Sequence, residues 1–248
     1  MTQTIVIKVG GNAINELDAN FFNQLRQWRE AGKQILIVHG GGPIITEWSK
    51  KLHLSVKKIN GIRVTDQAVL AVTKAVLLGL IQPQLLSKLS ANNLLAIGLN
   101  ASDQHLLVGE TLNQSLYGEV GKITQVNLLL LRQLLQKQIV VLAPLAQTKT
   151  GDWLNVNADL AAAEIASQLN ATKLVLMTDV PGVMTKGQVM SHLNWPKAQQ
   201  LLGKQIIKTG MAPKIKAAFQ ALNKGVAQAL ITDDLAHAGT TLTTVATD

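Results

Sequence analysis

The chain has 248 residues and a mass of 26.6 kDa, with 47% apolar and 15% charged side chains, so it can bury a sizeable core, and disordered and fibrous classes are excluded. Its formal net charge of +8 suits an anionic partner, whether a nucleic acid, a membrane surface or a small phosphorylated molecule. There is no cysteine, which excludes disulfide scaffolds, thiolate zinc sites and thiol nucleophiles and fits a reducing compartment.

The longest apolar runs, such as Ile139 to Ala146 and Ala75 to Ile81, are far shorter than the roughly 20 residues of a membrane-spanning helix. Near the N-terminus, the apolar stretch Ile5 to Val9 is interrupted by Lys8 and followed at once by glycines, unlike a secretory signal. We therefore expect a soluble protein in the cytoplasm.

Short β-branched runs alternate with longer stretches of helical periodicity along the chain. The predicted strands are Thr4 to Val9, Gln34 to Val38, Leu94 to Ile97, Gln138 to Leu142, Lys173 to Met177 and Val226 to Thr232. Helices are predicted from the spacing of Phe21, Leu25 and Trp28 and over Leu160 to Leu169. Strands that are apolar at nearly every position and separated by helices predict a three-layer αβα sandwich with a mostly parallel central sheet.

Weaker alternation with several glycines, at Asn60 to Ile62 and at His105 to Val120, predicts β-hairpins inserted at one edge of the sheet. No repeat, low-complexity tract or Pro/Ser-rich linker divides the chain. Any two halves would therefore be lobes of one continuous sheet, with a junction around Thr172.

Three glycine-containing turns follow predicted strands, at Val9 to Asn12, His39 to Pro43 and Thr178 to Val183. In open α/β sheets ligands bind at the carboxyl ends of the strands, where glycines let backbone N–H groups approach closely. The second turn leads into a helix through Pro43, and a helix N-terminus favours an anion. Any one of these turns could instead be a plain strand-to-helix connection. None is a P-loop or a Gly-x-Gly-x-x-Gly dinucleotide motif.

Two lysines occupy unusual positions. Lys8 lies near the end of an apolar strand, where a buried cation needs a partner, although its stem could also carry the charge to the surface. Lys214 falls in the first turn of a helix predicted to start near Met211, where a positive charge is unfavourable for the helix dipole. Either a specific role keeps this lysine there, or it is a solvated surface residue. Asp159 is the natural counter-charge for both, although Asn155 to Asp159 also fits a helix cap followed by an acidic residue.

Other polar residues carry weaker signals. Arg63 follows a turn and could grip a carboxylate bidentately or lie exposed on the surface. His39 adjoins the glycine run, but a structural role fits it better than a chemical one. The histidines lack metal-ligand spacing, so we predict no metal ligand, and there is no Gly-x-Ser-x-Gly hydrolase elbow.

Taken in order, several blocks resemble the amino acid kinase family over nearly the whole chain. They are Lys8 to Asn12, Val38 to Gly42, Asn60 to Thr65, Asn155 to Asp159, Thr178 to Val183, Gly210 to Lys214 and Ala238 to Thr240. The blocks Asn60 to Thr65 and Asn155 to Asp159 resemble the branch that acts on acetylglutamate, rather than those acting on aspartate, glutamate, carbamate or uridylate.

The resemblance implies the amino acid kinase fold and transfer of the γ-phosphoryl group of ATP to the side-chain carboxylate of N-acetyl-L-glutamate, giving N-acetyl-L-glutamyl 5-phosphate on the route to arginine or ornithine. An N-terminal lobe, residues 1–172, would hold the acetylglutamate site and a dimer interface. A C-terminal lobe, residues 173–248, would hold the ATP site.

The resemblance also implies roles for individual residues. Lys8 and Lys214 would stabilise the transferring phosphoryl group, and Asp159 would hold both lysines. Gly11 and Gly41 would donate backbone N–H groups to its oxygens. The acceptor would lie against Gly41, Gly42, Arg63 and Asn155. The nucleotide would lie against Asp179, Val180, Pro181, Gly182, Val183, Met184, Ile206, Ile207 and Lys208.

These residues suit the chemistry. Phosphoryl transfer mainly requires positioning and positive charge around the transferring oxygens. A glutamate-type carboxyl with a pKa of about 4.3 is already ionised at neutral pH, so no general base is needed. Mg²⁺ would arrive with ATP and bind through its phosphates and water, without a protein ligand.

Two segments, Gly98 to Asp103 and Leu145 to Lys149, depart from the family pattern at the expected rim of the acceptor pocket. The chain begins at its first strand, without the helical extension of hexameric, arginine-inhibited members, so we expect a homodimer that arginine does not inhibit.

Three alternatives stay open. A catalytically silent nucleotide-binding regulator would need a broken lysine pair, and a carbamate or glutamate kinase would use the same fold. A nucleic-acid-binding protein is suggested by the pI of 9.7 but disfavoured by only 3% aromatic residues and the lack of a dense basic run.

Overall fold

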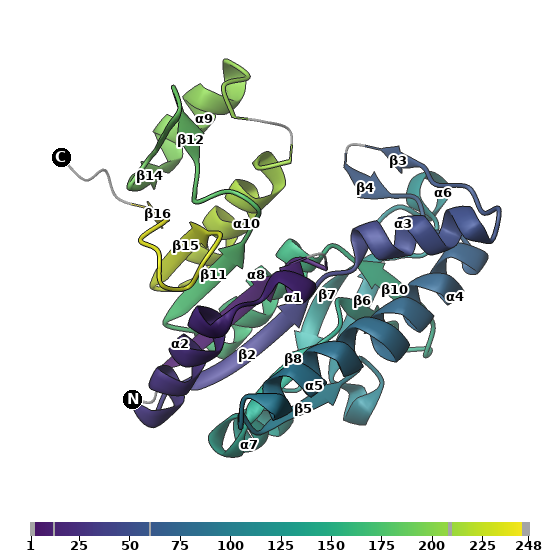
Figure 1. Cartoon of the computed structure of the whole chain (residues 1–248). Coiled ribbons are helices and arrows are strands. Elements are labelled where there is room, and N and C mark those ends of the chain that lie inside the picture. The colour runs from purple at the N-terminus through teal and green to yellow at the C-terminus, as the bar shows by residue number, and fades with distance from the viewer. Residues whose placement is uncertain (1–2, 12, 60, 208–209, 245–248) are drawn as a thin grey trace.

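The computed structural model describes residues 3–11, 13–59, 61–207 and 210–244. Within these ranges an eight-stranded sheet forms the centre of the molecule, in the order β14-β16-β15-β11-β1-β2-β8-β5 (Figure 1). Its strands are β1 (Thr4–Val9), β2 (Gln34–His39), β5 (Ala96–Leu99), β8 (Ile139–Leu142), β11 (Lys173–Met177), β14 (His192–Asn194), β15 (Gln228–Thr232) and β16 (Thr240–Thr243). Neighbouring strands are parallel except β15 and β16, which confirms the mostly parallel sheet.

Strands β1 and β11 have the predicted bounds, whereas β5 and β15 begin two residues later than expected. Leu94 and Val226 instead complete the ends of the preceding helices, because their N–H groups bond to Leu89 and Ala221 after a residue of positive φ. This is the Schellman arrangement, in which an apolar residue packs back on the helix it follows.

Helices cover both faces of the sheet. They are α2 (Ala19–Glu30) and α5 (Gln82–Ala91) on one face and α7 (Leu128–Lys137), α8 (Ala158–Leu169) and α10 (Ala212–Asn223) on the other. The handedness of the crossovers explains this division. The helices of the first set connect strands in the direction from β1 toward β5, and those of the second set connect strands in the opposite direction, from β5 toward β15. Because crossovers are right-handed, the two sets lie on opposite faces. The three-layer αβα sandwich is thus confirmed.

A second, smaller sheet lies beside the first. Strands β6 (Leu107–Thr111), β7 (Val120–Val126), β9 (Leu145–Gln147) and β10 (Trp153–Val156) close into a barrel, with the short helix α6 (Gln114–Tyr117) between β6 and β7. The hairpin prediction for this region is therefore right in its antiparallel pairing and wrong in its place at the edge of the central sheet. The barrel closes tightly because Gly121 lacks a Cβ, which would lie 2.5 Å from the side chain of Leu154.

The other predicted hairpin is formed by β3 (Lys58–Ile59) and β4 (Ile62–Arg63), with Asn60 of its turn outside the described residues. The remaining elements are α1 (Ala13–Glu16), α3 (Gly42–Lys51), α4 (Gln67–Val76), the π-helical turn η1 (Leu77–Ile81), η2 (Asp103–His105), β12 (Met184–Thr185), β13 (Gln188–Val189) and α9 (Trp195–Gly203).

Elements α4, η1 and α5 form one continuous helix, Gln67–Ala91, with a mean hydropathy of 1.7 over its most apolar window. By length and composition this helix could cross a membrane, although its separate apolar runs are short. Half of that window is buried inside the protein, however, as expected for a core helix.

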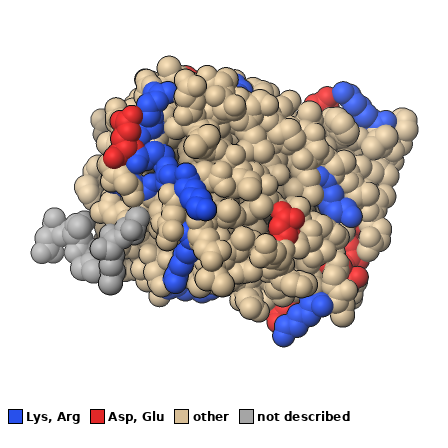
Figure 2. All heavy atoms as spheres, turned by 90° about the horizontal axis from the view of Figure 1, so that it is seen from below, with Lys and Arg blue, Asp and Glu red and all other residues tan. Residues whose placement is uncertain are grey.

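The basic side chains are not confined to one site. Seen from below, several Lys and Arg side chains gather on one part of the surface and others lie apart from them, while Asp and Glu are scattered (Figure 2). Part of the net charge of +8 therefore lies on this outer face.

The glycine turns after β1 and β2 touch each other through their backbones. A Cβ added to Gly11 would lie 2.7 Å from the Cα of Gly41, and one added to Gly41 would lie 2.6 Å from Ile81 and 2.7 Å from Leu77. The two turns therefore form one compact unit at the carboxyl edge of the sheet.

Gly11→Ala is expected to lower the free energy of unfolding by about 1–3 kcal/mol, because the new methyl group meets backbone rather than a movable side chain. Gly203→Ala, in an open position at the end of α9, is the matched control and is expected to be neutral or slightly stabilising. Urea unfolding of both variants measures the difference in the free energy of unfolding. Equal unfolding midpoints would show that a methyl group at Gly11 does not clash with the neighbouring turn.

Candidate active site

A cavity of about 700 Å³ lies at the carboxyl ends of β1, β2, β11 and β15 and extends to β4 and β10. Nine of the predicted site residues line it: Lys8, Gly11, Gly41, Gly42, Arg63, Asn155, Asp159, Asp179 and Lys214. Residues predicted from separate parts of the sequence thus share one cleft, at the edge where ligands bind in open α/β sheets.

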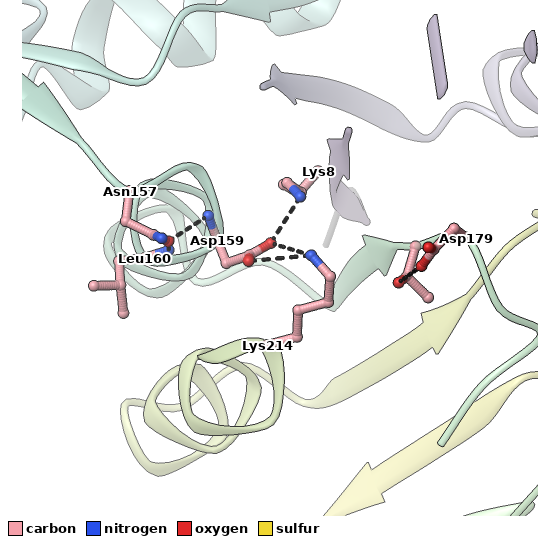
Figure 3. Close-up of polar contacts among 7 residues, drawn as sticks. Lys8, Asn157, Asp159, Leu160, Asp179 and Lys214 are labelled. Carbon is pink, nitrogen blue, oxygen red and sulfur yellow. Dashed lines mark hydrogen bonds and ion pairs between the residues drawn. The ribbon is translucent and has the colours of Figure 1, made fainter. Parts of the chain in front are cut away.

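Three charged side chains meet in this cleft (Figure 3). Lys8 Nζ lies 3.0 Å from Asp159 Oδ1, and Lys214 Nζ lies 3.1 Å from both carboxylate oxygens of Asp159. The three side chains are only 10–13% exposed. One carboxylate therefore holds two ammonium groups together, and the cluster keeps a net positive charge.

Local structure explains why the three groups converge. Asp159 is in the first turn of α8, where the side chain of Asn157 caps the helix by accepting from the N–H groups of Asp159 and Leu160. Helix α8 packs against β1, which carries Lys8, and against α10, whose first turn carries Lys214 after Pro213. The helix cap at Asn157 and the lysine in the first turn of α10, Lys214, both noted in the sequence, thus belong to the same charged cluster.

The electrostatics of the cluster favour a bound anion. Burial alone would raise the pKa of Asp159, but Lys8 and Lys214 outweigh it and hold that pKa below its ordinary value. Burial lowers the pKa of Lys214 to about 8, with Asp159 opposing and Lys8 adding to the shift. A phosphate group between the lysines would offset both the desolvation cost of the buried ammonium groups and their mutual repulsion.

Partial positive charge comes from the backbone nearby. Gly41 is the N-cap of α3, and no side chain of a described residue caps that helix start. The N–H groups at the start of α3, apart from Pro43, which has none, are accordingly available to an anionic ligand, whereas the Gly40 N–H is bonded to Val9 O.

A polar network builds the other end of the cleft. Arg63 Nη2 donates to Gly42 O and to Thr46 Oγ1, both at 2.7 Å. Asn155 Nδ2 donates at 3.0 Å to Thr65 Oγ1, and that hydroxyl donates to Arg63 O. Arg63 Nη1 is buried without a hydrogen-bond partner among the described residues, and burial lowers the pKa of its guanidinium. An unpaired buried donor pair of this kind suits a carboxylate ligand.

His39 is fully buried beside the glycine turn and does not line the cleft. Its Nδ1 lies 3.4 Å from Gly40 O, and burial lowers its pKa to about 4. The imidazole is therefore neutral at physiological pH, in keeping with the structural role expected from the sequence.

The predicted nucleotide residues are placed less uniformly. Asp179 lines the cleft apart from the charged cluster and accepts from the Thr178 hydroxyl (Figure 3). Five others, Val180, Pro181, Gly182, Val183 and Met184, do not line it, and the Val183 N–H instead bonds to Thr240 Oγ1. Ile206, which is exposed, and Ile207, which is buried, also lie outside the lining, and Lys208 lies outside the described residues.

Sequence reasoning missed two groups of residues. Thr46 and Thr65 support the polar end, and only the place of Thr65 within a motif block pointed to it. At the opposite end the cleft is lined by Glu16, Asp18, Asp233, Asp234 and His237, none of which the motifs indicated. Among the described residues, no three His, Asp or Glu side chains converge as a metal site.

The sequence pattern of the amino acid kinase family matches residues 3–233, and the chain belongs to that family. A Lactiplantibacillus plantarum protein named acetylglutamate kinase is 52% identical over 98% of both chains. Another of that name, from Leuconostoc citreum, is 45% identical over 98% of this chain and 100% of its own.

Solved structures agree with this assignment. A Streptococcus mutans structure superposes with a TM-score of 0.94 at 38% identity and covers 99% of this chain and 100% of its own. A carbamate kinase from Giardia lamblia, bound to AMP-PNP, has a TM-score of 0.64 at 16% identity over 98% and 99% of the two chains, so it supports the fold alone.

Asp159→Asn is expected to reduce the free energy of unfolding by about 3–5 kcal/mol, because it leaves two buried ammonium groups without a counter-charge. Glu110→Gln, which removes an exposed carboxylate paired with Lys122, is expected to change it by at most about 0.5 kcal/mol. Urea unfolding at neutral pH compares the two, and similar small effects would show that the cluster is not a buried ion pair.

Proposed function

We propose that this chain transfers the γ-phosphoryl group of ATP to the side-chain carboxylate of N-acetyl-L-glutamate, the reaction of an acetylglutamate kinase. The observation that carries the proposal is the convergence of Lys8, Asp159 and Lys214 in a cleft that also contains Arg63. Relatives of 45–52% identity over nearly the full length bear that name.

The reaction forms one bond and breaks another. A carboxylate oxygen of the acceptor attacks the γ-phosphorus, the bond from phosphorus to the bridging β,γ-oxygen breaks, and ADP leaves with the electron pair of that bond. Because the acceptor carboxylate is already ionised at neutral pH, no residue has to remove a proton. The neutral, buried His39 is consistent with this lack of a general base.

The enzyme's contribution is positive charge and alignment. Lys8 and Lys214 would contact the oxygens of the transferring group, where their charge stabilises the transition state. Asp159 would keep both ammonium groups in place, while Gly11 and Gly41 would donate backbone N–H groups. No part of this arrangement requires motion of a proton.

The acceptor would lie between the charged cluster and the polar end of the cleft. Arg63, through its unpaired Nη1, and Asn155 would bind its α-carboxylate end, with Gly41 and Gly42 beneath it. Acetylglutamate has a second carboxylate that can pair with the buried Arg63, whereas carbamate has only the carboxylate that reacts. The buried arginine therefore favours acetylglutamate as the acceptor. The intact lysine pair likewise favours an enzyme over a silent regulator.

ATP would approach from the C-terminal lobe, residues 173–248, along Asp179 to Met184 and Ile206 to Lys208. Mg²⁺ would enter with ATP and would neutralise part of the phosphate charge, and we assign it no protein ligand. The N-terminal lobe, residues 1–172, would carry the acceptor and the interface of a cytoplasmic homodimer.

Lys8→Ala and Lys214→Ala are each expected to lower kcat by at least about 100-fold, because each removes charge from the transferring group. Lys216→Ala is the matched control, since Lys216 lies exposed on the same helix two residues further on and should leave kcat unchanged. ADP release that depends on acetylglutamate is the measurement. Equal activity in all three variants, or wild-type ADP release without preference for acetylglutamate over carbamate or glutamate, would overturn the proposal.

The pH dependence should follow Lys214. Its ammonium form is lost as the pH rises through its lowered pKa of about 8, so kcat/KM for ATP is expected to decline above that pH. In Lys214→Arg the guanidinium stays protonated, and the remaining activity should lack this alkaline decline. An identical decline in the variant would assign it to another group.

A further inference from the structure

Thr46 occupies the point where the glycine turn after β2 meets the predicted acceptor site. It lies one helical turn after Gly42 in α3, and its hydroxyl donates at 2.9 Å to Gly42 O. The hydroxyl oxygen of Thr46, Oγ1, also accepts a hydrogen bond at 2.7 Å from Arg63 Nη2. Gly42 O completes the triangle by accepting from that Nη2, also at 2.7 Å.

The direction of every hydrogen bond in this triangle is fixed. A guanidinium can only donate, and the single hydrogen of the Thr46 hydroxyl is used on Gly42 O, so the Thr46 oxygen must accept from Arg63. Both N–H groups of Nη2 are thereby used. Because the guanidinium is planar, holding Nη2 at two points also fixes where Nη1 lies.

Nη1 is the part of Arg63 left for a ligand, since it is buried and has no partner among the described residues. A buried cationic donor that is rigidly held and unpaired loses less freedom on binding a carboxylate than a mobile arginine would. The hydroxyl of Thr46 thus contributes to the binding of an anion that it does not itself need to touch.

We infer that Thr46 is a positioning residue that orients Arg63 toward the α-carboxylate of the acceptor. The inference rests on the proposed function, because it names how the acceptor's second carboxylate is recognised. Thr46 also ties Arg63 to the glycine turn. In the proposed reaction the backbone of that turn would face the transferring phosphoryl group, so the two ends of the acceptor would be located relative to one another.

A threonine in a helix often bonds to the carbonyl four residues before it without further purpose. Thr73 does so in α4, where its hydroxyl donates at 2.7 Å to Val69 O and has no hydrogen bond to an arginine among the described residues. Thr73 does not line the cleft. It therefore provides a matched control, with the same substitution and the same helical bond.

The test compares Thr46→Val, Thr46→Ser and Thr73→Val in steady-state kinetics. Thr46→Val is expected to raise KM for acetylglutamate by about 10-fold, with kcat and KM for ATP within about twofold of wild type, because binding of the acceptor is weakened rather than the chemical step. Thr46→Ser keeps the acceptor oxygen and should restore KM to within about twofold. Thr73→Val should leave all constants unchanged.

A second readout separates orientation of Arg63 from general damage to the cleft. 4-Acetamidobutyrate is acetylglutamate without its α-carboxylate, and its inhibition constant should be the same in Thr46→Val and wild type. A constant that rises as much as the KM for acetylglutamate would overturn the inference. In an Arg63→Gln background, Thr46→Val should have no further effect on KM, whereas an undiminished effect would also overturn it.

The two proposals fail in different ways. If the wild-type protein releases no ADP with acetylglutamate, the proposed function is wrong. If the wild type is active and Thr46→Val has a wild-type KM for acetylglutamate, only the role of Thr46 is wrong. Thermal unfolding of each variant before the assay ensures that folded protein is compared.

Discussion

The site depends on one carboxylate shared by two ammonium groups. Without Asp159, the ammonium groups of Lys8 and Lys214 would repel each other at a position where water is largely excluded. With it, their separate elements can pack together while one unit of positive charge is left over. The N-terminal ends of α3, α8 and α10 and the glycine turns direct further positive potential to the same edge of the sheet.

The two ends of the cleft are built on different principles. At the charged cluster, ammonium groups and backbone N–H groups surround the place where charge would be redistributed in the proposed reaction, and these suit a group whose geometry changes during that reaction. At the polar end, Arg63 and Asn155 are locked by hydroxyl groups into a fixed pattern of donors, which suits a part of the substrate that only has to be held. The polar end of the cleft would thus align the substrate, while the charged cluster would stabilise the charge of the transferring group.

The sequence was most informative where local rules apply. Strands β1 and β11 could be bounded from apolar runs, and Asp159 could be named as a counter-charge, because burial penalises an unpaired lysine. The ends of β5 and β15 were misjudged because Leu94 and Val226 resemble strand residues while completing helices. The barrel escaped prediction because β9 and β10 have only three and four residues, and because its closure needs the long-range pairing of β10 with β7 and of β9 with β6 in addition to the local pairing of β9 with β10. Thr46 gave no signal, because its partner Arg63 arrives from a distant hairpin.

The backbone contact between the turns of Gly11 and Gly41 also has a consequence for how this sequence can change with time. Neither position has room for even a methyl group unless the opposite chain segment or the side chains of Ile81 and Leu77 give way. A viable substitution at Gly41 would thus require a compensating one at Ile81 or Leu77, which makes these positions epistatic, whereas at Gly11 the backbone itself would have to shift. Single substitutions at this corner of the fold are therefore costly, whatever acceptor a descendant enzyme comes to use.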